Sequence, residues 1–476
     1  MKPPLSAMIS LRMLAALLGA GLSCSLSAQD FSRVAPKTPA AETQAPELPA
    51  TPTTPAPASD AVLVDALRGL VFLTDRAALR AEGRDATGVV ADNLPVLQTP
   101  EFEDIARRYL GRPVTLRLLN ELSRDLVLHY RRNDRPVVDV LVPEQNIHNG
   151  VVQVLVLEGR LGQVKAEGNL HFSTEQLVRQ VRLAPGEPIG GSALLADVSW
   201  LNQNPFRQVD LVFARGAQPG QTDVILRTRD RRPVRFFAGY EDSGNDATGD
   251  SRLIAGMNLG NAFGRDHQFN YQLTAAPDFS SLVAHSASYV LPLESSRRVL
   301  TVFGSHATSE PELPGGVFSL DGTSWQASAR LAFAPISRNV NLTHQFTLGA
   351  DFKRSNNNLE FGGFQVFANS TEIAQLVAGY NFTHNRPGVT LSGNAQLVWS
   401  PGGLTPGNES GRFRAARAMA RADYAYLQFS LERRARLAGE WSLLNRFSGQ
   451  VSSANLLGSE QLGLGGYINL RGYEER

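Results

Sequence analysis

The chain has 476 residues, and its 46 Lys and Arg residues nearly balance its 45 Asp and Glu residues, giving a formal net charge of +1. This length is more than one ordinary soluble domain needs, and the balanced charge argues against a nucleic-acid partner. After the first segment, no apolar run reaches the roughly 18 residues of a transmembrane helix. A β-barrel stays possible, because its apolar residues alternate along each strand.

The amino terminus has the features of a secretory signal peptide, which we predict over residues 1–28. Lys2 and Arg12 supply positive charge, residues 13–22 are apolar but too few for a stable anchor, and small residues follow. Cys24 is the only cysteine, so the mature chain would have neither a disulfide nor thiol chemistry. A lipoprotein signal is an alternative, although the sequence GLSC lacks the usual Leu three residues before the cysteine.

Residues 29–61 form a predicted linker that is rich in Pro, Ala and Thr. Such a composition cannot bury a core and favours an extended, polyproline-like chain. The linker is interpreted either as a tether or plug connection, or as a plain spacer.

Two α/β domains are predicted next, over residues 62–159 and 160–230, each in the order strand, helix, helix, strand, strand. The first has predicted elements at 67–73, 101–110, 115–130, 137–142 and 151–157. The second has them at 161–166, 173–181, 192–201, 208–214 and 223–228. Apolar side chains recur at helical spacing in the helices, and Ser173 with Gln176 has the spacing of a capping box. The repeat is one of pattern, without strong sequence identity.

From residue 231 to 476 the pattern predicts strands only, about eleven of them. In residues 389–399, Leu391, Leu397 and Trp399 share one face, and polar side chains occupy the other. Runs of 9 to 11 residues suit a tilted strand that crosses an outer membrane, and short gaps alternate with long ones. An all-β transmembrane antiparallel barrel is therefore predicted, with a soluble β-sandwich as the alternative.

The final segment, residues 458–476, is glycine-rich and carries one internal arginine. Its notable residues are Gly463, Gly465, Gly466, Leu470, Arg471, Gly472 and Tyr473. The tetrapeptide resembles the (Val/Ile)-Arg-Gly-(Tyr/Phe) loop of POTRA-barrel transporters, with Leu470 in the first position. The stretch LGGYINLRGYEE resembles the form found in two-partner secretion transporters, which export hemolysins and filamentous hemagglutinins.

This resemblance implies two POTRA domains followed by a sixteen-stranded barrel, in which the loop after the eleventh strand folds back into the lumen. By the same resemblance, Arg471 contacts an acidic residue of the inner wall, Gly472 permits a tight backbone and Tyr473 packs beside it. The family's wall aspartate lies on a strand beyond this loop. Because the sequence stops at Arg476, we expect that it is truncated and that further strands follow.

The implied function is secretion of an unfolded partner protein, an adhesin or hemolysin-like passenger, across the outer membrane from POTRA domains in the periplasm. Outer-membrane lipid and the barrel assembly machinery are further expected partners. No phosphate-binding loop is present, so transport would draw on the folding of the passenger outside the cell. Two alternatives stay open: an assembly factor that inserts barrel proteins, whose relatives usually carry three or more POTRA domains, and a passive porin, which needs none.

The sequence does not favour an enzyme, a metal site or a cofactor. Eight histidines are scattered without metal-ligand spacing, and the serines lie in no nucleophile elbow. Residues 241–250 form an acidic, glycine-rich turn that fits either an exposed loop or a calcium site. Residues 229–232 (RDRR) form a charged run before the predicted barrel, suited to lipid headgroups, to the barrel rim or to a solvated hinge.

Overall fold

The structure is a computed structural model of the chain. It describes residues 35–40, 46–49, 59–245, 248–310, 318–333, 336–339, 341–361 and 364–463. These form two compact units, one of residues 38–235 with 258–268 and the other of the remaining described residues. No helix in this part of the chain has the length and hydropathy of a membrane span.

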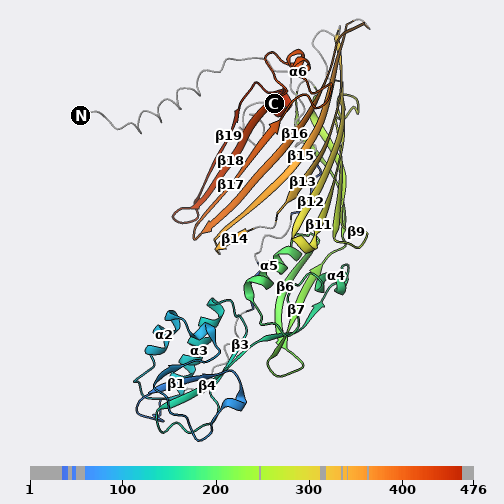
Figure 1. The fold of residues 1–476 in the computed structure, drawn as a ribbon. Coiled ribbons are helices and arrows are strands. Elements are labelled where there is room, and N and C mark those ends of the chain that lie inside the picture. Colours follow the sequence, from blue (N-terminus) through green and yellow to red (C-terminus); the bar gives the residue numbers. More distant parts are fainter. Residues whose placement is uncertain are drawn as a thin grey trace, which may run out of the picture. The chain divides into compact units, whose positions relative to one another are not determined.

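The first α/β domain has a four-stranded sheet in the order β2-β1-β4-β3, in which β1 pairs in parallel with both neighbours. Figure 1 shows helices α2 and α3 beside this sheet. Its elements are β1 (Gly69–Leu73), η1 (Arg76–Ala78), β2 (Gly88–Val90), η2 (Pro95–Leu97), α2 (Pro100–Arg107), α3 (Leu116–Arg132), β3 (Val138–Leu141) and β4 (Val151–Glu158). The order predicted from the sequence is present, with one addition. Strand β2 lies where the sequence predicts a loop. The prediction misses this strand because three residues are too few to show an alternating pattern.

Helix α3 forms where apolar residues recur on one face. The Thr115 hydroxyl caps it by accepting the Leu118 N–H at 3.1 Å. Leu122, Leu126 and Tyr130 on its inner face are completely buried in the core. Strands β1 and β4 have buried side chains on both faces, which explains their continuous apolar sequences.

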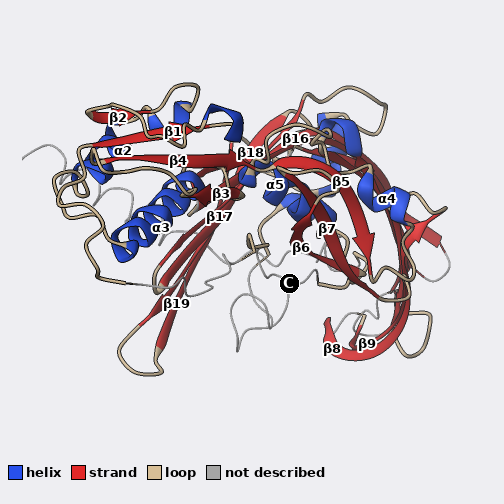
Figure 2. Ribbon diagram, turned by 90° about the horizontal axis from the view of Figure 1, so that it is seen from below, coloured by secondary structure: helices blue, strands red, loops and turns tan. Residues whose placement is uncertain are grey.

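The second α/β domain repeats this order with a three-stranded sheet, β5-β7-β6, in which β5 and β7 are parallel. Its elements are β5 (Arg160–Glu167), α4 (Thr174–Val178), α5 (Gly191–Leu201), β6 (Arg207–Arg215) and β7 (Gln221–Asp230). Figure 2 shows helices α2 to α5 gathered at these small sheets. Ser173 caps α4 as predicted, accepting the Gln176 N–H at 3.2 Å. A hydrogen bond from Lys165 lowers the pKa of Asp223 below its ordinary value.

The large sheet confirms the predicted all-β region. Its elements are β8 (Val234–Asn245), β9 (Gly249–Ala262), β10 (His267–Ala275), β11 (Val283–Leu293), η3 (Glu294–Ser296), β12 (Arg298–Ser309), β13 (Phe318–Ala332), β14 (Ile336–Asn339), β15 (Leu342–Phe361), β16 (Phe364–Arg386), β17 (Val389–Ser400), α6 (Ser410–Ala416), β18 (Tyr424–Arg436), β19 (Ser442–Ser452) and η4 (Gly458–Glu460). Eleven of its twelve strands follow one another from β8 to β19, and β14 pairs with β15 at the side. The predicted fold class, α+β domains followed by a barrel-type sheet, is confirmed at this level.

The two faces of the large sheet differ in chemistry. The register aligns Val302, Ala329, Ala350, Leu376 and Trp399 in one row across five strands. The large apolar side chains of this face are exposed: Val302, Phe346, Leu348, Leu376, Leu397, Trp399, Leu427, Leu431, Leu443, Phe447 and Val451. The opposite face, here called the polar face, carries rows such as Ser286, Ser305, Gln326 and Lys353. An exposed apolar face and a polar face are what a membrane barrel requires.

Truncating a side chain in the core of the first α/β domain should lower the stability of that domain. We expect Leu126→Ala to lower its free energy of unfolding by roughly 2–5 kcal/mol, because a fully buried leucine is lost and a cavity remains. Leu128→Ala on the same helix, where Leu128 is 40% exposed, is the matched control and should cost less than about 1 kcal/mol. Urea unfolding in detergent, followed by limited proteolysis, measures both; equal losses would contradict the assignment of this helix face.

Candidate functional site

The six residues predicted to form the barrel-loop site lie outside the described residues. They are Gly465, Gly466, Leu470, Arg471, Gly472 and Tyr473, whereas the described part of the chain ends at Gly463. Their predicted contacts therefore stay predictions. Among the described residues, no group of three or more His, Cys, Asp and Glu is arranged to hold a metal ion.

A buried ion pair lies at the centre of a polar site in the unit that contains both α/β domains. Arg207 begins β6, and Asp266 lies in the turn between β9 and β10. Two parallel hydrogen bonds join them, from Nη1 to Oδ1 at 2.8 Å and from Nη2 to Oδ2 at 2.6 Å. Their side chains are 1% and 5% exposed. The bidentate geometry gives both orientation and strength.

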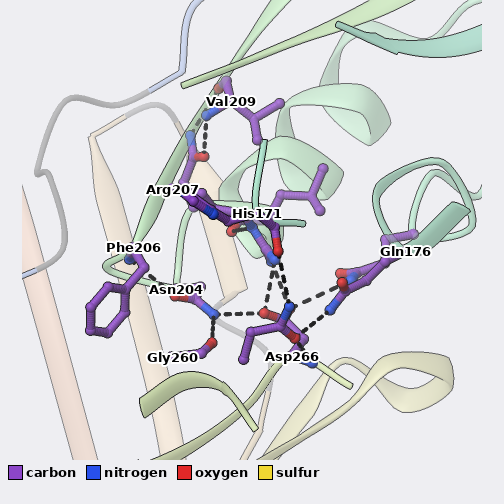
Figure 3. Close-up of polar contacts among 12 residues, drawn as sticks. His171, Gln176, Asn204, Phe206, Arg207, Val209, Gly260 and Asp266 are labelled. Carbon is purple, nitrogen blue, oxygen red and sulfur yellow. Dashed lines mark hydrogen bonds and ion pairs between the residues drawn. The ribbon is translucent and has the colours of Figure 1, made fainter. Parts of the chain in front are cut away.

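Further groups satisfy the remaining polar atoms of this pair, as Figure 3 shows. Arg207 Nε donates to the carbonyl of Leu201 at 2.9 Å, and the guanidinium lies over the Phe172 ring at 4.8 Å. The Asn204 amide donates to Asp266 Oδ1 and to the Gly260 carbonyl, both at 2.6 Å. This dense bonding is what a buried charge pair needs if its desolvation is to be offset.

The neighbouring polar contacts extend the site along helix α4. The Gln176 amide donates to Asn261 Oδ1 at 3.1 Å, and the same oxygen accepts the Asp266 N–H at 2.9 Å. Gln176 was predicted to complete a capping box within its own helix. Its side chain is instead used for this long-range contact.

Backbone geometry also fixes the turn that carries Asp266. Asp266 has a φ of 62°, in the left-handed region that side chains rarely adopt. A Cβ on Gly260 would lie 2.0 Å from the Phe206 ring, so only glycine fits there. The strained turn and the close approach both require the surrounding contacts to hold them in place.

The predicted charged run at 229–232 contributes protein contacts to this region. Arg231 donates to the Pro205 carbonyl at 2.8 Å and lies over the Phe206 ring at 5.3 Å. Arg229 pairs with Asp210 at 3.1 Å on the surface. The interpretations offered for this run, which are lipid headgroups, the barrel rim and a solvated hinge, stay predictions.

A second polar cluster lies on the polar face of the large sheet. Asp351 on β15 pairs with Arg330 on β13 at 2.7 Å and accepts from the Gln375 amide on β16 at 3.0 Å. The Tyr424 hydroxyl on β18 donates to Gln375 Oε1 at 2.9 Å. The cluster therefore links β13, β15 and β16, which are successive in the sheet, and also β18, which lies beyond β17, through charged and polar groups on the polar face.

Two α/β domains followed by a two-faced antiparallel sheet define the class of POTRA-barrel proteins. The family model described as haemolysin secretion/activation protein ShlB/FhaC/HecB matches residues 220–476, and the POTRA domain model of ShlB type matches residues 85–159. The chain belongs to this haemolysin secretion/activation family.

Relatives and solved structures agree with this membership. The chain is 25% identical over 196 residues to the heme/hemopexin transporter protein HuxB of Haemophilus influenzae, covering 39% of this chain and 35% of HuxB. It is 24% identical over 373 residues to the outer membrane transporter CdiB of Dickeya dadantii, covering 77% and 65%. The chain thus matches about a third of the length of HuxB and about two thirds of the length of CdiB from Dickeya dadantii. The structure of CdiB from Escherichia coli shares the fold, with a TM-score of 0.64 and 20% identity over 92% of this chain and 76% of that one.

Removing one partner of the Arg207–Asp266 pair should destabilise the unit of residues 38–235 with 258–268. We expect Asp266→Ala to destabilise this unit by about 3–5 kcal/mol, because it leaves the Arg207 guanidinium buried and uncompensated. Asp210→Ala breaks the exposed pair with Arg229 and should cost less than about 1 kcal/mol. The urea midpoint for protease cleavage within residues 160–230 reports both variants. A variant Asp266→Ala that is as resistant as Asp210→Ala would show that the buried pair does not stabilise this unit.

Proposed function

We propose that the chain is an outer-membrane transporter that recognises an unfolded partner protein in the periplasm and secretes it to the cell surface. The observation that carries this proposal is the match of residues 220–476 to a secretion/activation family. The exposed apolar face and the polar face of the large sheet support it, since lipid would cover the first and a wet lumen the second. The proposal includes a signal peptide at 1–28, a linker at 29–61, POTRA domains at 62–159 and 160–230 and a barrel from 231.

The α/β domains offer surfaces on which a passenger can dock. Strands β2 and β3 form the edges of the first sheet, and β5 and β6 form those of the second. An extended passenger segment would add a strand to such an edge, aided by apolar grooves beside the helices. The passenger would then pass along the polar face, and its folding outside would prevent return. This role needs neither catalysis nor a cofactor.

The passenger class follows from the family and forms part of the proposal. We propose an adhesin or hemolysin-like protein, encoded beside this gene, as the secreted partner. Lipid of the outer membrane and the barrel assembly machinery would be the other partners.

Removing the docking domains should separate recognition from pore formation. Deletion of residues 62–228 from the chromosomal gene should leave a pore in the outer membrane but abolish release of the neighbouring gene's product. Immunoblots of medium and membrane fractions measure both. Deletion of residues 50–58 within the predicted linker is the control, and it should preserve secretion if that segment is a spacer. Secretion that survives the larger deletion would refute docking on these domains.

The loop motif provides a second test of the same proposal. Arg471→Ala should strongly reduce secretion, because a charge-assisted contact to the barrel wall would be lost. Arg471→Lys keeps the charge but not the bidentate geometry, and we expect it to restore only part of the activity. Secreted partner is compared at equal levels of folded transporter in the membrane. Full activity of Arg471→Ala would remove the motif from the mechanism.

A further inference from the structure

The two most exposed large apolar side chains among the described residues belong to the unit that contains both α/β domains. Leu170 is 81% exposed and Phe263 is 85% exposed. Leu170 lies in the loop between β5 and α4 of the second α/β domain, and Phe263 lies in the turn between β9 and β10. A single exposed apolar side chain needs no explanation. The placement and backbone geometry of these two decide whether they form a binding surface.

Hydrogen bonds bring the loop of Leu170 and the turn of Phe263 together. The Asn261 amide donates to the His171 carbonyl at 3.4 Å, which joins residues 90 positions apart in the chain. The Gln176 amide on α4 donates to Asn261 Oδ1 at 3.1 Å, and Figure 3 shows His171 and Gln176 in this site. His171 directly follows Leu170, and Asn261 lies two residues before Phe263. The two exposed side chains therefore come from adjoining loops.

The loop that carries Leu170 has a fixed backbone. The Asp230 carboxylate at the end of β7 accepts the N–H groups of Leu170 at 3.0 Å, His171 at 2.8 Å and Phe172 at 3.1 Å. The Phe172 side chain is 2% exposed and packs in the core of the domain. Because the backbone is held at three successive N–H groups, the loop buries Phe172 and presents Leu170 to the solvent.

The turn that carries Phe263 has an unfavourable backbone conformation for a phenylalanine. Phe263 and Gly264 have φ values of 58° and 66°, and the Arg265 N–H donates to the Ala262 carbonyl at 3.2 Å. Two central residues with positive φ are the mark of a type I′ turn, whose first central position favours Asn, Asp or Gly. An aromatic residue there is strained. Burial within the described residues does not offset this strain, because Phe263 is exposed; a contact outside the chain would.

The side of β9 from which this turn continues indicates lipid as that contact. Leu253 and Leu259 alternate along β9 with buried residues such as Asn258. Side chains two positions apart in a strand share a face, so Asn261 lies on the face of Leu253 and Leu259. Leu253 is exposed, and lipid would cover the exposed apolar face of the proposed barrel. The apolar side chains of the two loops therefore continue a lipid-covered surface.

Arg265 adds a charge of the sign that phospholipid headgroups attract. It follows Gly264 in the same turn and is exposed. Its guanidinium makes neither a hydrogen bond nor an ion pair with the residues that the structure describes. Arginine binds phosphate through charge-assisted hydrogen bonds, and a basic side chain next to exposed apolar ones is typical of a segment that lies at a membrane surface.

We propose that Leu170, Phe263 and Arg265 form a membrane-binding edge, through which the second α/β domain contacts the periplasmic leaflet of the outer membrane. Leu170 and Phe263 enter the boundary between headgroups and acyl chains, and Arg265 binds a headgroup phosphate. The proposal rests on the outer-membrane location that is part of the proposed function. It needs no passenger.

Fluorescence quenching in vesicles tests the membrane contact. The full-length transporter with Cys24→Ser and Leu170→Cys carries a bimane probe at position 170 and is reconstituted in phosphatidylethanolamine and phosphatidylglycerol. A nitroxide on the upper acyl chain should quench this probe strongly, and iodide in the water should quench it weakly. Ala217→Cys, exposed in the turn between β6 and β7, is the matched control at the other end of those strands. Its ratio of lipid to iodide quenching should be severalfold lower.

Phe263→Asn separates membrane binding from folding. Asn suits the first central position of a type I′ turn, so the urea midpoint of the variant should be unchanged or higher. The equilibrium between bound and free edge, obtained from the quenching ratio at position 170, should shift about tenfold toward the free edge, because a large apolar side chain leaves the lipid. Arg265→Gln should shift it about fivefold by the loss of one charge at the surface. A Phe263→Asn variant that loses stability but keeps the ratio would overturn the membrane role of Phe263.

The quenching results also exclude other occupants of this surface. Iodide quenching at position 170 equal to that at position 217 would overturn the membrane-binding edge. Protection from iodide that begins only when an unfolded passenger is added would overturn it in favour of a protein partner. Neither readout needs secretion, so a transporter that exports no partner would refute the proposed function while the probe at position 170 still decides whether the edge binds lipid.

Discussion

Strands that cross a lipid bilayer must satisfy every backbone hydrogen bond within the sheet, because hydrocarbon offers no other partner. The long antiparallel registers of the large sheet meet this demand. All 11 residues of β11 are paired with β12, and β12 is paired on its other side with β13. Once the register is fixed, each side chain is assigned to one face. The apolar exterior and the polar face are consequences of that pairing.

Part of the polar face is covered by two segments of the same chain, and contacts of two kinds hold them there. Phe413, Leu456 and Leu457 form a small local core, and the Lys353–Glu460 pair supplies a charged contact beside it. The remainder of this face keeps polar groups such as Asp351 and Gln375, bonded to one another within the wall.

Much of this architecture could be predicted from the sequence, because local pattern decides it. Helical spacing and the cap at Thr115 predicted α3, and alternation predicted the strand at 389–399. The Arg207–Asp266 ion pair could not be predicted, since it joins residues 59 positions apart through a turn with no periodic signal. Gln176 shows the same limit, because a local motif suggested capping while a distant partner takes its side chain. The Arg471 motif came from family resemblance, which names a residue without giving its contacts.

Two of the buried ion pairs among the described residues differ in how many hydrogen bonds surround them. Arg207 and Asp266 share two hydrogen bonds, and Leu201, Phe172 and Asn204 satisfy the groups around them. Separating them would leave several buried polar groups without partners at once, which is costly. Lys353 and Glu460 share a single hydrogen bond, with one added by Tyr426. Fewer groups would lose partners if this pair separated. The network around Arg207 and Asp266 therefore satisfies more buried polar atoms than the network around Lys353 and Glu460.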